Sequence, residues 1–335
     1  MADVYFFNKN ILIDLEKTIL FATKKWKGGV AVKVHFGEYG NLYHVRPQII
    51  STCVKALKKN KLKPFVFDTL VAYNNMRNNV KGHRQVATMN GFTRETMGCP
   101  VKIGTTYKTL KTEHLSAQID KNLYNVKNVL VISHAKGHSH CAGFGGAIKN
   151  MGMGFATAHT KNIMHAISGP KLVGRCRECG TCVKVCPTHA ISLKGGWHCN
   201  FERGKNIDLG HCIGCGRCVR NCPYKALAHR ATSLGALLAE VSEAGLQNKK
   251  GKLFVNVAMN ITKECDCCAE TKIVCKDIGL FASKDPVAVD MATINAIKKA
   301  CPEFFSKIQD ISPMDQIKTA EKLRIGKKAY VLELI

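Results

Sequence analysis

Residues 176–187 read CRECGTCVKVCP, and residues 212–223 read CIGCGRCVRNCP. Both copies place three cysteines at two-residue gaps and a fourth cysteine directly before a proline, a spacing that serves [4Fe–4S] clusters. A cubane needs four thiolates, and the fourth cysteine of each copy typically reaches the cluster of the other copy. The sequence therefore predicts two [4Fe–4S] clusters, one held by Cys176, Cys179, Cys182 and Cys222 and one by Cys212, Cys215, Cys218 and Cys186.

Zinc and disulfide bonds are the alternative uses of these cysteines. Zinc sites usually combine two C-x-x-C units around one ion, whereas each copy here carries four cysteines in a three-plus-one arrangement. The first residues, MADVYFFNKN, lack the basic start and long apolar stretch of a signal peptide. No apolar run reaches the roughly 18 residues of a membrane helix. Seventeen cysteines without an export signal indicate metal and redox chemistry in the cytoplasm, away from membranes.

The length and charge of the chain bound its organisation and its partners. With 335 residues, we expect an α/β host domain at residues 1–170 and 231–335 and an inserted α+β ferredoxin-like domain with two [4Fe–4S] clusters at residues 171–230. A formal net charge of +26 favours an acidic electron carrier of the ferredoxin or flavodoxin type, or an anionic small molecule. A solvated lysine-rich surface gives the same count. Nucleic acid is less favoured, because the chain shows no helix-turn-helix, zinc-finger or RNP-type signature.

Short apolar runs alternate with amphipathic stretches outside the cysteine motifs. Strands are predicted at residues 4–7, 30–34, 64–67, 128–132, 253–258 and 330–334, and helices at residues 11–26, 47–60 and 286–300. Pro47 suits a first helical turn, and Asp285 is the expected N-cap of the last of these helices. This alternation predicts an α/β fold with a mostly parallel sheet.

Polar side chains follow several of these strands directly. In an open α/β sheet, ligands bind beyond the carboxyl ends of the strands. A single histidine there is more often a structural, hydrogen-bonded residue, but the shared position predicts one catalytic cleft. In it, histidines would transfer protons and lysines would bind an anionic substrate. The residues expected to line this cleft are His35, Glu38, Asp68, His134, Lys136, His138 and Lys149.

A glycine-rich stretch, GFGGAIKNMG at residues 143–152, follows the predicted 128–132 strand. Free backbone N–H groups in such a loop form an anion-binding nest, and Lys136 and Lys149 would add positive charge. The histidines spaced two residues apart before it, His138 and His140 among them, suit metal binding or proton transfer. The alternative is a turn that only permits close packing. The stretch matches no nucleotide-binding fingerprint.

A third cysteine group follows the predicted 253–258 strand. Cys265, Cys267, Cys268 and Cys275 lie within eleven positions, and their spacing differs from that of the two ferredoxin-type motifs. Structural zinc, a further iron–sulfur centre and reactive thiols remain open. We expect Cys265 and Cys267 to bind one metal or to form a dithiol that faces the cleft, with Asp266 or a histidine completing a mixed site. In an extended segment, Cys268 would point the other way.

Four phrases of the chain together carry a family resemblance. They are VAVKVHFGEYGN, Asp68-Thr69 with Tyr73 and Arg77, SHAKGH…GFGGAIKNMGMG and ECDCC…DIGLFASKDPVAVD. The combination resembles the domain-of-unknown-function family 362 over nearly the whole chain, including a ferredoxin insertion found in many members. The host domain is distantly similar to the lactate racemase group, which implies a two-lobed α/β fold with a cleft. The nickel cofactor of that group is not carried over, because its ligands do not map onto this chain. Leu70-Val71-Ala72 replaces the more polar stretch expected after Asp-Thr, which bears on substrate preference.

These patterns predict an iron–sulfur oxidoreductase of anaerobic-type metabolism. Electrons would pass through the two clusters to an anionic substrate or a further metal centre in the cleft. The alternative is an electron-transfer protein without chemistry of its own, whose host domain docks a redox partner. A nucleic-acid-binding iron–sulfur protein is a third, less favoured function.

Overall fold

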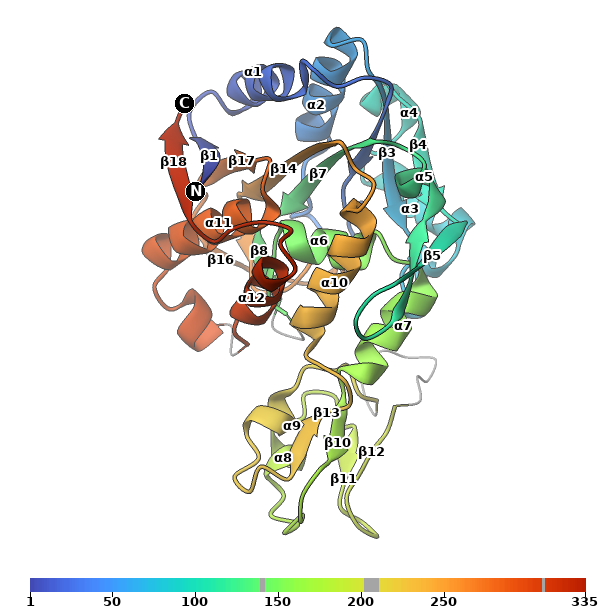
Figure 1. The fold of residues 1–335 in the computed structure, drawn as a ribbon, viewed down its shortest axis with the longest axis vertical. Helices are drawn as coiled ribbons and strands as arrows, with labels where there is room; N and C mark the ends of the chain where they lie inside the picture. The colour runs from blue at the N-terminus through green and yellow to red at the C-terminus, as the bar shows by residue number, and fades with distance from the viewer. Residues whose placement is uncertain (139–141, 202–210, 309–310) are drawn as a thin grey trace.

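The structure of the protein is a computed structural model that describes residues 1–138, 142–201, 211–308 and 311–335 (Figure 1). His140, part of the histidine pattern above, lies outside these residues. The centre of the fold is an eight-stranded sheet with the order β18-β1-β17-β14-β7-β2-β3-β4. Its strands are β1 (Ala2–Phe7), β2 (Gly29–Lys33), β3 (Lys63–Thr69), β4 (Val101–Gly104), β7 (Asn128–His134), β14 (Gly251–Ala258), β17 (Gly279–Ser283) and β18 (Tyr330–Leu334).

The direction of these strands confirms the predicted α/β fold with a mostly parallel sheet. Within this sheet, β17 runs antiparallel to both of its neighbours, β1 and β14, and every other neighbouring pair is parallel. All the predicted strands are present at or near their expected bounds. The sequence pattern does not predict β4 and β17, because apolar runs this short carry little periodicity.

Both faces of the central strands are buried, so the sheet separates two cores. Val129 and Val131 of β7 belong to one core, whereas Leu130 and Ile132 belong to the other. Helices α1 and α2 pack on the second core, and α6, α10, α11 and α12 pack on the first, which Figure 1 shows as two layers around the sheet. Buried parallel strands of this kind require such cover on both faces.

The three predicted helices are present as α1, α2 and α11 near their expected bounds, and the sequence pattern did not predict the other helices. The helices are α1 (Ile11–Thr23), α2 (Pro47–Lys59), α3 (Val80–Met89), α4 (Arg94–Met97), α5 (Lys121–Tyr124), α6 (Ala147–Gly154), α7 (Ala158–Ile167), α8 (Thr181–Lys184), α9 (Arg217–Arg220), α10 (Leu234–Leu246), α11 (Pro286–Ala300) and α12 (Met314–Lys322). The Asp285 carboxylate accepts hydrogen bonds from the N–H groups of Val287 and Ala288, which confirms it as the N-cap of α11. In the described part of the chain, no helix has the length and apolar character needed to cross a membrane.

Small elements surround the strand ends. The antiparallel pairs are β5 (Tyr107–Lys111) with β6 (Ser116–Asp120), β8 (Lys136–His138) with β9 (Gly143–Gly145), and β15 (Ile261–Thr262) with β16 (Ile273–Cys275). A 3-10 turn spans Met76–Asn78, and a π-helical turn spans Phe304–Ile308. The β8/β9 pair and the β15/β16 pair follow β7 and β14, so both lie beyond the carboxyl edge of the sheet.

Residues 170–230, here called the cysteine lobe, protrude from the sheet and its helices at the lower end of Figure 1. Strand β10 (Pro170–Leu172) pairs with β13 (Leu227–His229), and β11 (Ile191–Ser192) pairs with β12 (His198–Cys199). The two cysteine motifs share one backbone conformation. Glu178 (φ 50°) corresponds to Gly214 (φ 70°), and His189 (φ 52°) corresponds to Lys225 (φ 50°). The sequence repeat is therefore also a structural repeat.

The cysteine lobe is anchored to α7. His165 of α7 forms a 2.8 Å hydrogen bond between its Nδ1 and the carbonyl oxygen of Ile213, inside the second cysteine motif. At the end of the same helix, the Ser168 carbonyl oxygen lies 2.6 Å from Nδ1 of His229. These contacts fix the second motif against the end of α7.

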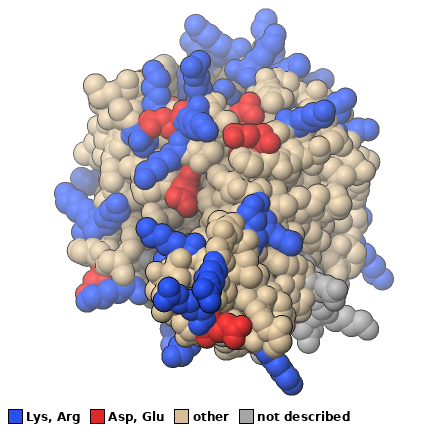
Figure 2. All heavy atoms as spheres, turned by 60° about the horizontal axis from the view of Figure 1, so that its bottom comes forward, with Lys and Arg blue, Asp and Glu red and all other residues tan. Residues whose placement is uncertain are grey.

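Basic side chains dominate the exposed surface of the cysteine lobe. Figure 2 shows the face on which this end comes forward, with many more Lys and Arg side chains than acidic ones. Glu178 is the one exposed acidic residue among the described positions of the lobe. The exposed basic residues of the lobe are Lys171, Arg175, Arg177, Lys184, Lys194, Arg220, Lys225 and Arg230.

Candidate functional site

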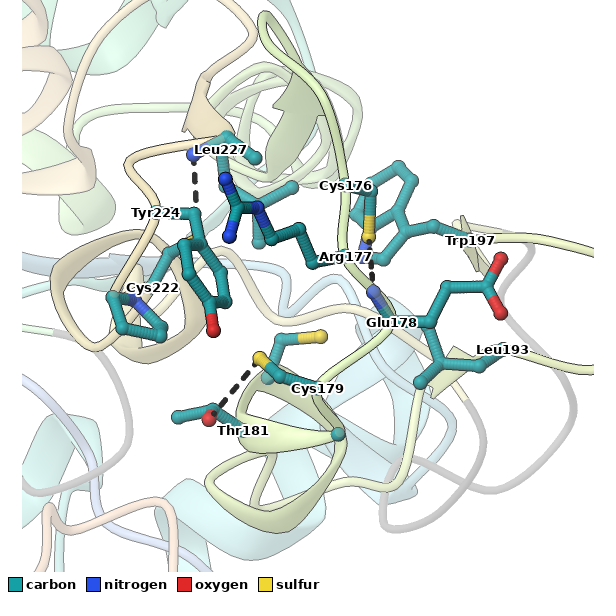
Figure 3. A pocket seen from close by; sticks show the side chains of 14 residues that line it. Cys176, Arg177, Glu178, Cys179, Thr181, Leu193, Trp197, Cys222, Tyr224 and Leu227 are labelled. Atoms are coloured by element: carbon teal, nitrogen blue, oxygen red, sulfur yellow. Dashed lines mark hydrogen bonds between the residues drawn. The ribbon is translucent and has the colours of Figure 1, made fainter.

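The first cysteine-lined hollow lies in the cysteine lobe (Figure 3). Cys176, Cys179 and Cys182 of the first motif line it together with Cys222 of the second motif. The empty space among the lining residues measures about 340 Å³, part of it open to solvent. Three cysteines of one motif and the last cysteine of the other therefore surround one space, which is the grouping expected for a cubane with exchanged fourth ligands.

The second hollow repeats this arrangement. Cys212, Cys215 and Cys218 line it together with Cys186, and the empty space is about 290 Å³. A fifth cysteine, Cys199 of β12, also lines this hollow. The two hollows are thus equivalent in their four motif cysteines and differ in the side chains contributed by the β11–β12 hairpin.

Backbone amides point at the cysteine sulfurs of both hollows. In the first hollow, the N–H of Glu178 donates to Cys176 Sγ over 3.4 Å, and the N–H of Ala226 donates to Cys222 Sγ over 3.3 Å. In the second hollow, the sulfurs of Cys212 and Cys186 receive equivalent bonds over 3.4 and 3.3 Å. Hydrogen bonds to sulfur favour thiolates and tune the potential of iron–sulfur clusters.

The crowding of thiols in each hollow fits a cationic metal group. Burial and, to a smaller extent, the neighbouring Cys215, Cys212 and Cys186 raise the pKa of Cys218 to about 12. Thiols packed this closely cannot all ionise by themselves, whereas bound metal ions deprotonate their thiol ligands. Four thiols at this spacing therefore fit the ligands of a bound metal group better than four free thiols.

Trp197 supplies a further observation on the first hollow. Its indole lines the space (Figure 3), and the buried Nε1 atom has no hydrogen-bond partner. Burial raises the pKa of Cys182, and the nearby indole opposes that rise without reaching hydrogen-bond geometry. A buried donor without a partner, beside four cysteines, fits a site in which a sulfur of a bound cluster would accept a hydrogen bond from it.

Polar residues beyond the sheet form a second assembly, here called the strand-end cluster. At its base, Lys33 of β2 and Asp68 of β3 make a fully buried ion pair with 2.9 Å between Nζ and Oδ1. Nζ of Lys33 also donates to Asn150 Oδ1 over 3.0 Å. Burial pushes the pKa of Asp68 upward, but Lys33, His83 and His35 together outweigh it and hold this pKa well below its usual range. Neighbouring parallel strands thus bring together charges distant in sequence.

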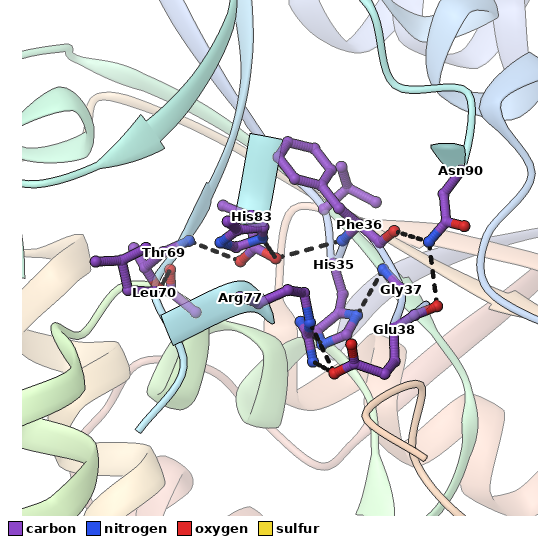
Figure 4. Close-up of polar contacts among 12 residues, drawn as sticks. His35, Phe36, Gly37, Glu38, Thr69, Leu70, Arg77, His83 and Asn90 are labelled. Carbon is purple, nitrogen blue, oxygen red and sulfur yellow. Dashed lines mark hydrogen bonds and ion pairs between the residues drawn. The ribbon is translucent and has the colours of Figure 1, made fainter. Parts of the chain in front are cut away.

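Arg77 organises the next layer of the cluster (Figure 4). This buried guanidinium contacts Oε2 of Glu38 through Nε at 3.1 Å and Nη2 at 3.0 Å, and Nη2 donates to the Tyr73 hydroxyl over 2.7 Å. Nη1 lies 3.0 Å from Nε2 of His35, whose Nδ1 accepts the Gly37 N–H. Burial lowers the pKa of His35 to about 4, although nearby Cys267 opposes the effect. His35 is therefore neutral at pH 7 and retains some exposed surface.

Lys161 of α7 enters the same cluster from the other side. Its Nζ donates to the Thr69 hydroxyl over 2.9 Å and to the Leu70 carbonyl over 2.6 Å. Burial lowers the pKa of Lys161 to about 7, with Asp68 opposing the effect and Lys33 adding to it. An amine that titrates near neutral pH is able to donate or accept a proton.

His134 and Lys136, beyond β7, hold the third cysteine group in place. Nδ1 of His134 lies 2.7 Å from Oδ1 of Asp266, and Nζ of Lys136 lies 2.9 Å from Oδ2. Nε2 of His134 contacts the carbonyl oxygen of Met259 at 2.9 Å. Both ring nitrogens are engaged inside the fold, so the geometry favours a positioning role for His134 over proton transfer to a substrate.

The third cysteine group forms a turn. The N–H of Cys268 donates to the carbonyl oxygen of Cys265 over 2.9 Å. The neighbouring thiols of Cys267 and Cys268 lower the pKa of Cys265 well below its usual value, while the pKa of Cys268 rises. Cys267 Sγ lies 3.4 Å from Nε2 of His35. The segment turns instead of extending, so the condition under which Cys268 would point the other way is not met.

The glycine-rich stretch differs from the expected anion-binding nest. The amide N–H groups of Ala147 and Ile148 donate to the carboxylate of Asp290 over 2.7 and 3.0 Å. A Cβ on Gly146 would lie 2.4 Å from Oδ1 of Asp290, so glycine is needed there for close packing. Asp290 ends the phrase DPVAVD, and the stretch GFGGAIKN contains its partners. The two phrases thus occur together because they bind each other.

The structure brings together most of the residues predicted for the cleft. His35, Glu38 and Asp68 join the strand-end cluster directly, and Lys149, which is partly exposed, lies close enough to Cys265 to help lower its pKa. His138 lies in β8, where its Nδ1 accepts the Ala142 N–H over 3.4 Å. Their catalytic roles remain predictions.

Sequence reasoning missed several members of the cluster. Lys33, a lysine within the apolar run VAVKV, signals a buried charge that needs a partner. Tyr73 and Arg77 appeared in the family phrases without an assigned role. Lys161 lies on an ordinary amphipathic helix and gives no signal in the sequence.

Similarity to known proteins is found in a family model and in a solved structure. No curated protein matches the chain. Among solved structures, the lactate racemase apoprotein from Thermoanaerobacterium thermosaccharolyticum is similar, with 10% sequence identity and a TM-score of 0.45. The match covers 90% of this chain but 58% of that one, so this chain spans less than two thirds of that protein. This is the distant similarity expected from the sequence. A family model described as domain of unknown function DUF362 matches residues 30–295, and the chain therefore belongs to the DUF362 family.

Proposed function

We propose that this protein is an iron–sulfur oxidoreductase. In this proposal, an inserted ferredoxin-type domain at residues 171–230 holds two [4Fe–4S] clusters, and the host domain at residues 1–170 and 231–335 reduces or oxidises an anionic substrate at the strand-end cluster. The observation that carries the proposal is the composition of the two hollows. Each is lined by three cysteines of one motif and the last cysteine of the other. When bound, the clusters would supply one-electron transfer, and the cysteines must stay reduced, as in the cytoplasm.

Helix α7 supports a route from the lobe to the strand-end cluster. His165 binds the backbone of the second cysteine motif, and Lys161, one helical turn earlier, binds Thr69 and Leu70. Residues four apart lie on the same face of a helix, about 6 Å apart along its axis. The cluster of the second motif is therefore the inner cluster in this proposal, and the cluster of the first motif receives electrons from outside.

The charges of the strand-end cluster support an anionic substrate. Lys33, Arg77 and Lys136 each contact a carboxylate. Lys161, in contrast, contacts a hydroxyl and a carbonyl group, which leave its charge uncompensated. Its pKa near 7 reflects burial and the neighbouring Lys33. An anion bound beside Lys161 would raise that pKa and gain from the charge.

The exposed basic residues of the cysteine lobe support an acidic electron carrier as partner. Arg177 and Tyr224 line the first hollow, and the Arg177 guanidinium lies 4.9 Å from the centre of the Tyr224 ring. A carrier of the ferredoxin or flavodoxin type would be attracted by this surface, and the attraction would fall as salt screens it.

Metal analysis of anaerobically purified protein tests the proposal. We expect about eight irons and eight acid-labile sulfides per chain, with low-potential signals on reduction. Zinc in place of iron would overturn it. To separate an enzyme from a simple carrier, Lys149→Ala should abolish substrate turnover and leave both clusters intact. If electron exchange with an acidic carrier is the chain's whole activity, that variant would remain fully active.

A further inference from the structure

We propose that Cys265 and Cys268 form a reversible disulfide that accepts two electrons from the two clusters. The inference rests on the proposed function and names the first acceptor in the host domain. If the anionic substrate reacts by two electrons, a carrier that stores a pair of electrons would link it to the one-electron clusters. A dithiol in the strand-end cluster would serve as that carrier.

The backbone of the third cysteine group holds these two residues at disulfide distance. The 2.9 Å bond from the Cys268 N–H to the Cys265 carbonyl closes a four-residue turn. Such a turn keeps the first and fourth Cα atoms within about 7 Å, and disulfides join Cα atoms about 4.4–6.8 Å apart. The two thiols are close enough to shift each other's pKa in opposite directions, that of Cys265 downward and that of Cys268 upward. Oxidation therefore requires little movement of the backbone.

The turn is pinned at both ends, so the two sulfurs are held in place. Asp266, between the cysteines, is bound by His134 and Lys136 over 2.7 and 2.9 Å. At the other end, the carbonyl oxygen of Cys268 accepts the side-chain amide of Asn41 over 2.7 Å. Cys265 is buried, and Cys268 is partly exposed.

The reduction step balances with one electron from each reduced cluster. The sulfur–sulfur bond breaks, and the two electrons and one proton give a thiolate at Cys265 and a thiol at Cys268. The neighbouring thiols of Cys267 and Cys268, with the nearby charges of Lys149 and Lys136, lower the pKa of Cys265 and so favour its thiolate. The low-potential external carrier re-reduces the clusters, one electron at a time.

The route along α7 ends beside this turn. Lys161 lies close enough to Cys267 for the two groups to influence each other electrostatically, and Cys267 precedes Cys268 directly. Cys267 itself faces His35 at 3.4 Å and is left outside the proposed pair. Its thiol therefore remains free to meet a substrate beside His35 and Arg77.

Among the described residues, no compact trio of ligand atoms forms at this turn, which favours a dithiol over a single metal ion. Tetrahedral zinc with bonds of about 2.3 Å to sulfur brings every pair of sulfur ligands to about 3.8 Å. Over the described ranges of the chain, a compact trio of potential ligand atoms, all within 4.8 Å of one another, occurs at Glu113, His114 and Glu240 and not at this turn.

An anaerobic reductive titration tests the proposal, with thiol alkylation and peptide mass spectrometry as a second readout. After mild oxidation, the wild-type chain should accept two electrons beyond those taken by its clusters, and the Cys265 and Cys268 peptide should become alkylated only after reduction. The variant Cys268→Ser should lose the two extra electrons. Cys301→Ser, which removes one thiol of the neighbouring Cys275 and Cys301 pair, should retain them.

Three results would overturn the inference. They are equal electron uptake by wild type and Cys268→Ser, alkylation of both cysteines before reduction, and a metal ion beyond the cluster iron that Cys268→Ser fails to bind. The iron and sulfide content separates this failure from that of the proposed function. With about eight irons present and no disulfide, only the dithiol is wrong. Alkylation of the wild type decides the matter if the variant does not fold.

Discussion

The cysteine lobe and the strand-end cluster use their polar atoms in opposite ways. In the lobe, sulfurs crowd around two hollows and the indole N–H of Trp197 has no partner. In the strand-end cluster, buried charges meet each other directly, as Lys33 meets Asp68 and Arg77 meets Glu38. The first region thus gathers sulfurs and an unpaired donor around two hollows, whereas most charges of the second region pair with each other, with Lys161 as the exception.

This difference predicts two kinds of response to mutation. The lobe has few buried apolar side chains, and those of Ile191 and Leu227 pack with Cys182 and Cys218 in a core of their own. Small domains with so little core depend on metal for stability. The strand-end cluster instead lies between two large cores and should respond as an ordinary buried polar network.

The largest expected effect comes from the crossed ligands of the lobe. Cys222→Ser should lose about four of eight irons and spare the cluster of the second motif, because Cys222 lines the first hollow. Cys186→Ser should have the converse effect, because Cys186 lines the second hollow. Iron content and the spectra of the surviving cluster after reduction measure both results.

Cys199→Ser is the matched control, since Cys199 lines the second hollow but belongs to neither motif. It should retain about eight irons. If Cys222→Ser instead damages the cluster of its own motif, the crossed assignment is wrong.

The second effect concerns the buried ion pair of the strand-end cluster. Asp68→Asn leaves the charge of Lys33 without its partner in a fully buried place, which should cost about 3–5 kcal/mol of unfolding free energy. Denaturant unfolding followed by the fluorescence of Trp26, which contacts Gly251 at the start of β14, measures it.

The exposed pair of Lys59 and Glu16 provides the control for this prediction. Glu16→Gln should cost less than about 1 kcal/mol, because solvent screens surface pairs. Equal costs for the two variants would show that Asp68 and Lys33 are not a coupled pair. The comparison between the strand-end cluster, whose charges pair with each other, and the cysteine lobe would then lose its basis.

Sequence patterns reveal the lobe more completely than the strand-end cluster. The spacing of Cys176 to Cys186 repeats 36 residues later, so the grouping of sulfurs follows from local chain geometry. Strand ends such as His35 and Asp68 are also visible, because apolar runs stop there. In both cases the relevant residues are close in sequence or follow a general rule of parallel sheets.

The rest of the site depends on tertiary contacts that one sequence does not encode locally. Lys161 reaches Thr69 from a helix 92 positions away. The glycine stretch was expected to bind an anion, but the carboxylate of Asp290, from a later helix, occupies its amides. A glycine-rich stretch looks the same in the sequence whether its amides bind a carboxylate of the chain or an external anion.

The third effect is a pH dependence that comes from Lys161. The pKa of Lys161 is about 7 in the folded protein and 10.5 in the unfolded chain. Between these pH values, the unfolded chain therefore binds more protons at Lys161 than the folded protein does. Unfolding free energy should therefore rise with pH in this window relative to Lys161→Met, by at most about 1.4 kcal/mol per pH unit. Below pH 7 the difference between the two proteins should be constant.

Denaturant unfolding of both proteins at several pH values from 6 to about 10 checks this slope. Lys249→Met should show a shorter window, because burial lowers the pKa of Lys249 only to about 8. Parallel curves for wild type and Lys161→Met would mean that Lys161 keeps an ordinary pKa. It would then be a fixed positive charge and not a proton donor.

The smallest expected effect concerns a single hydrogen bond in the cysteine lobe. If the orphaned Nε1 of Trp197 donates to a sulfur of the first cluster, it stabilises the reduced, more negative cluster. Trp197→Phe removes a bond of about 1 kcal/mol and should lower the reduction potential of that cluster by about 40 mV for one electron. The cluster of the second motif should be unchanged, because Trp197 does not line its hollow.

A potentiometric titration of the two reduction steps measures both values, and Trp26→Phe, outside the lobe, controls for the loss of an indole elsewhere. Equal shifts of both clusters would indicate a general change in the lobe, whereas an unchanged first cluster would leave the indole without a role in tuning it.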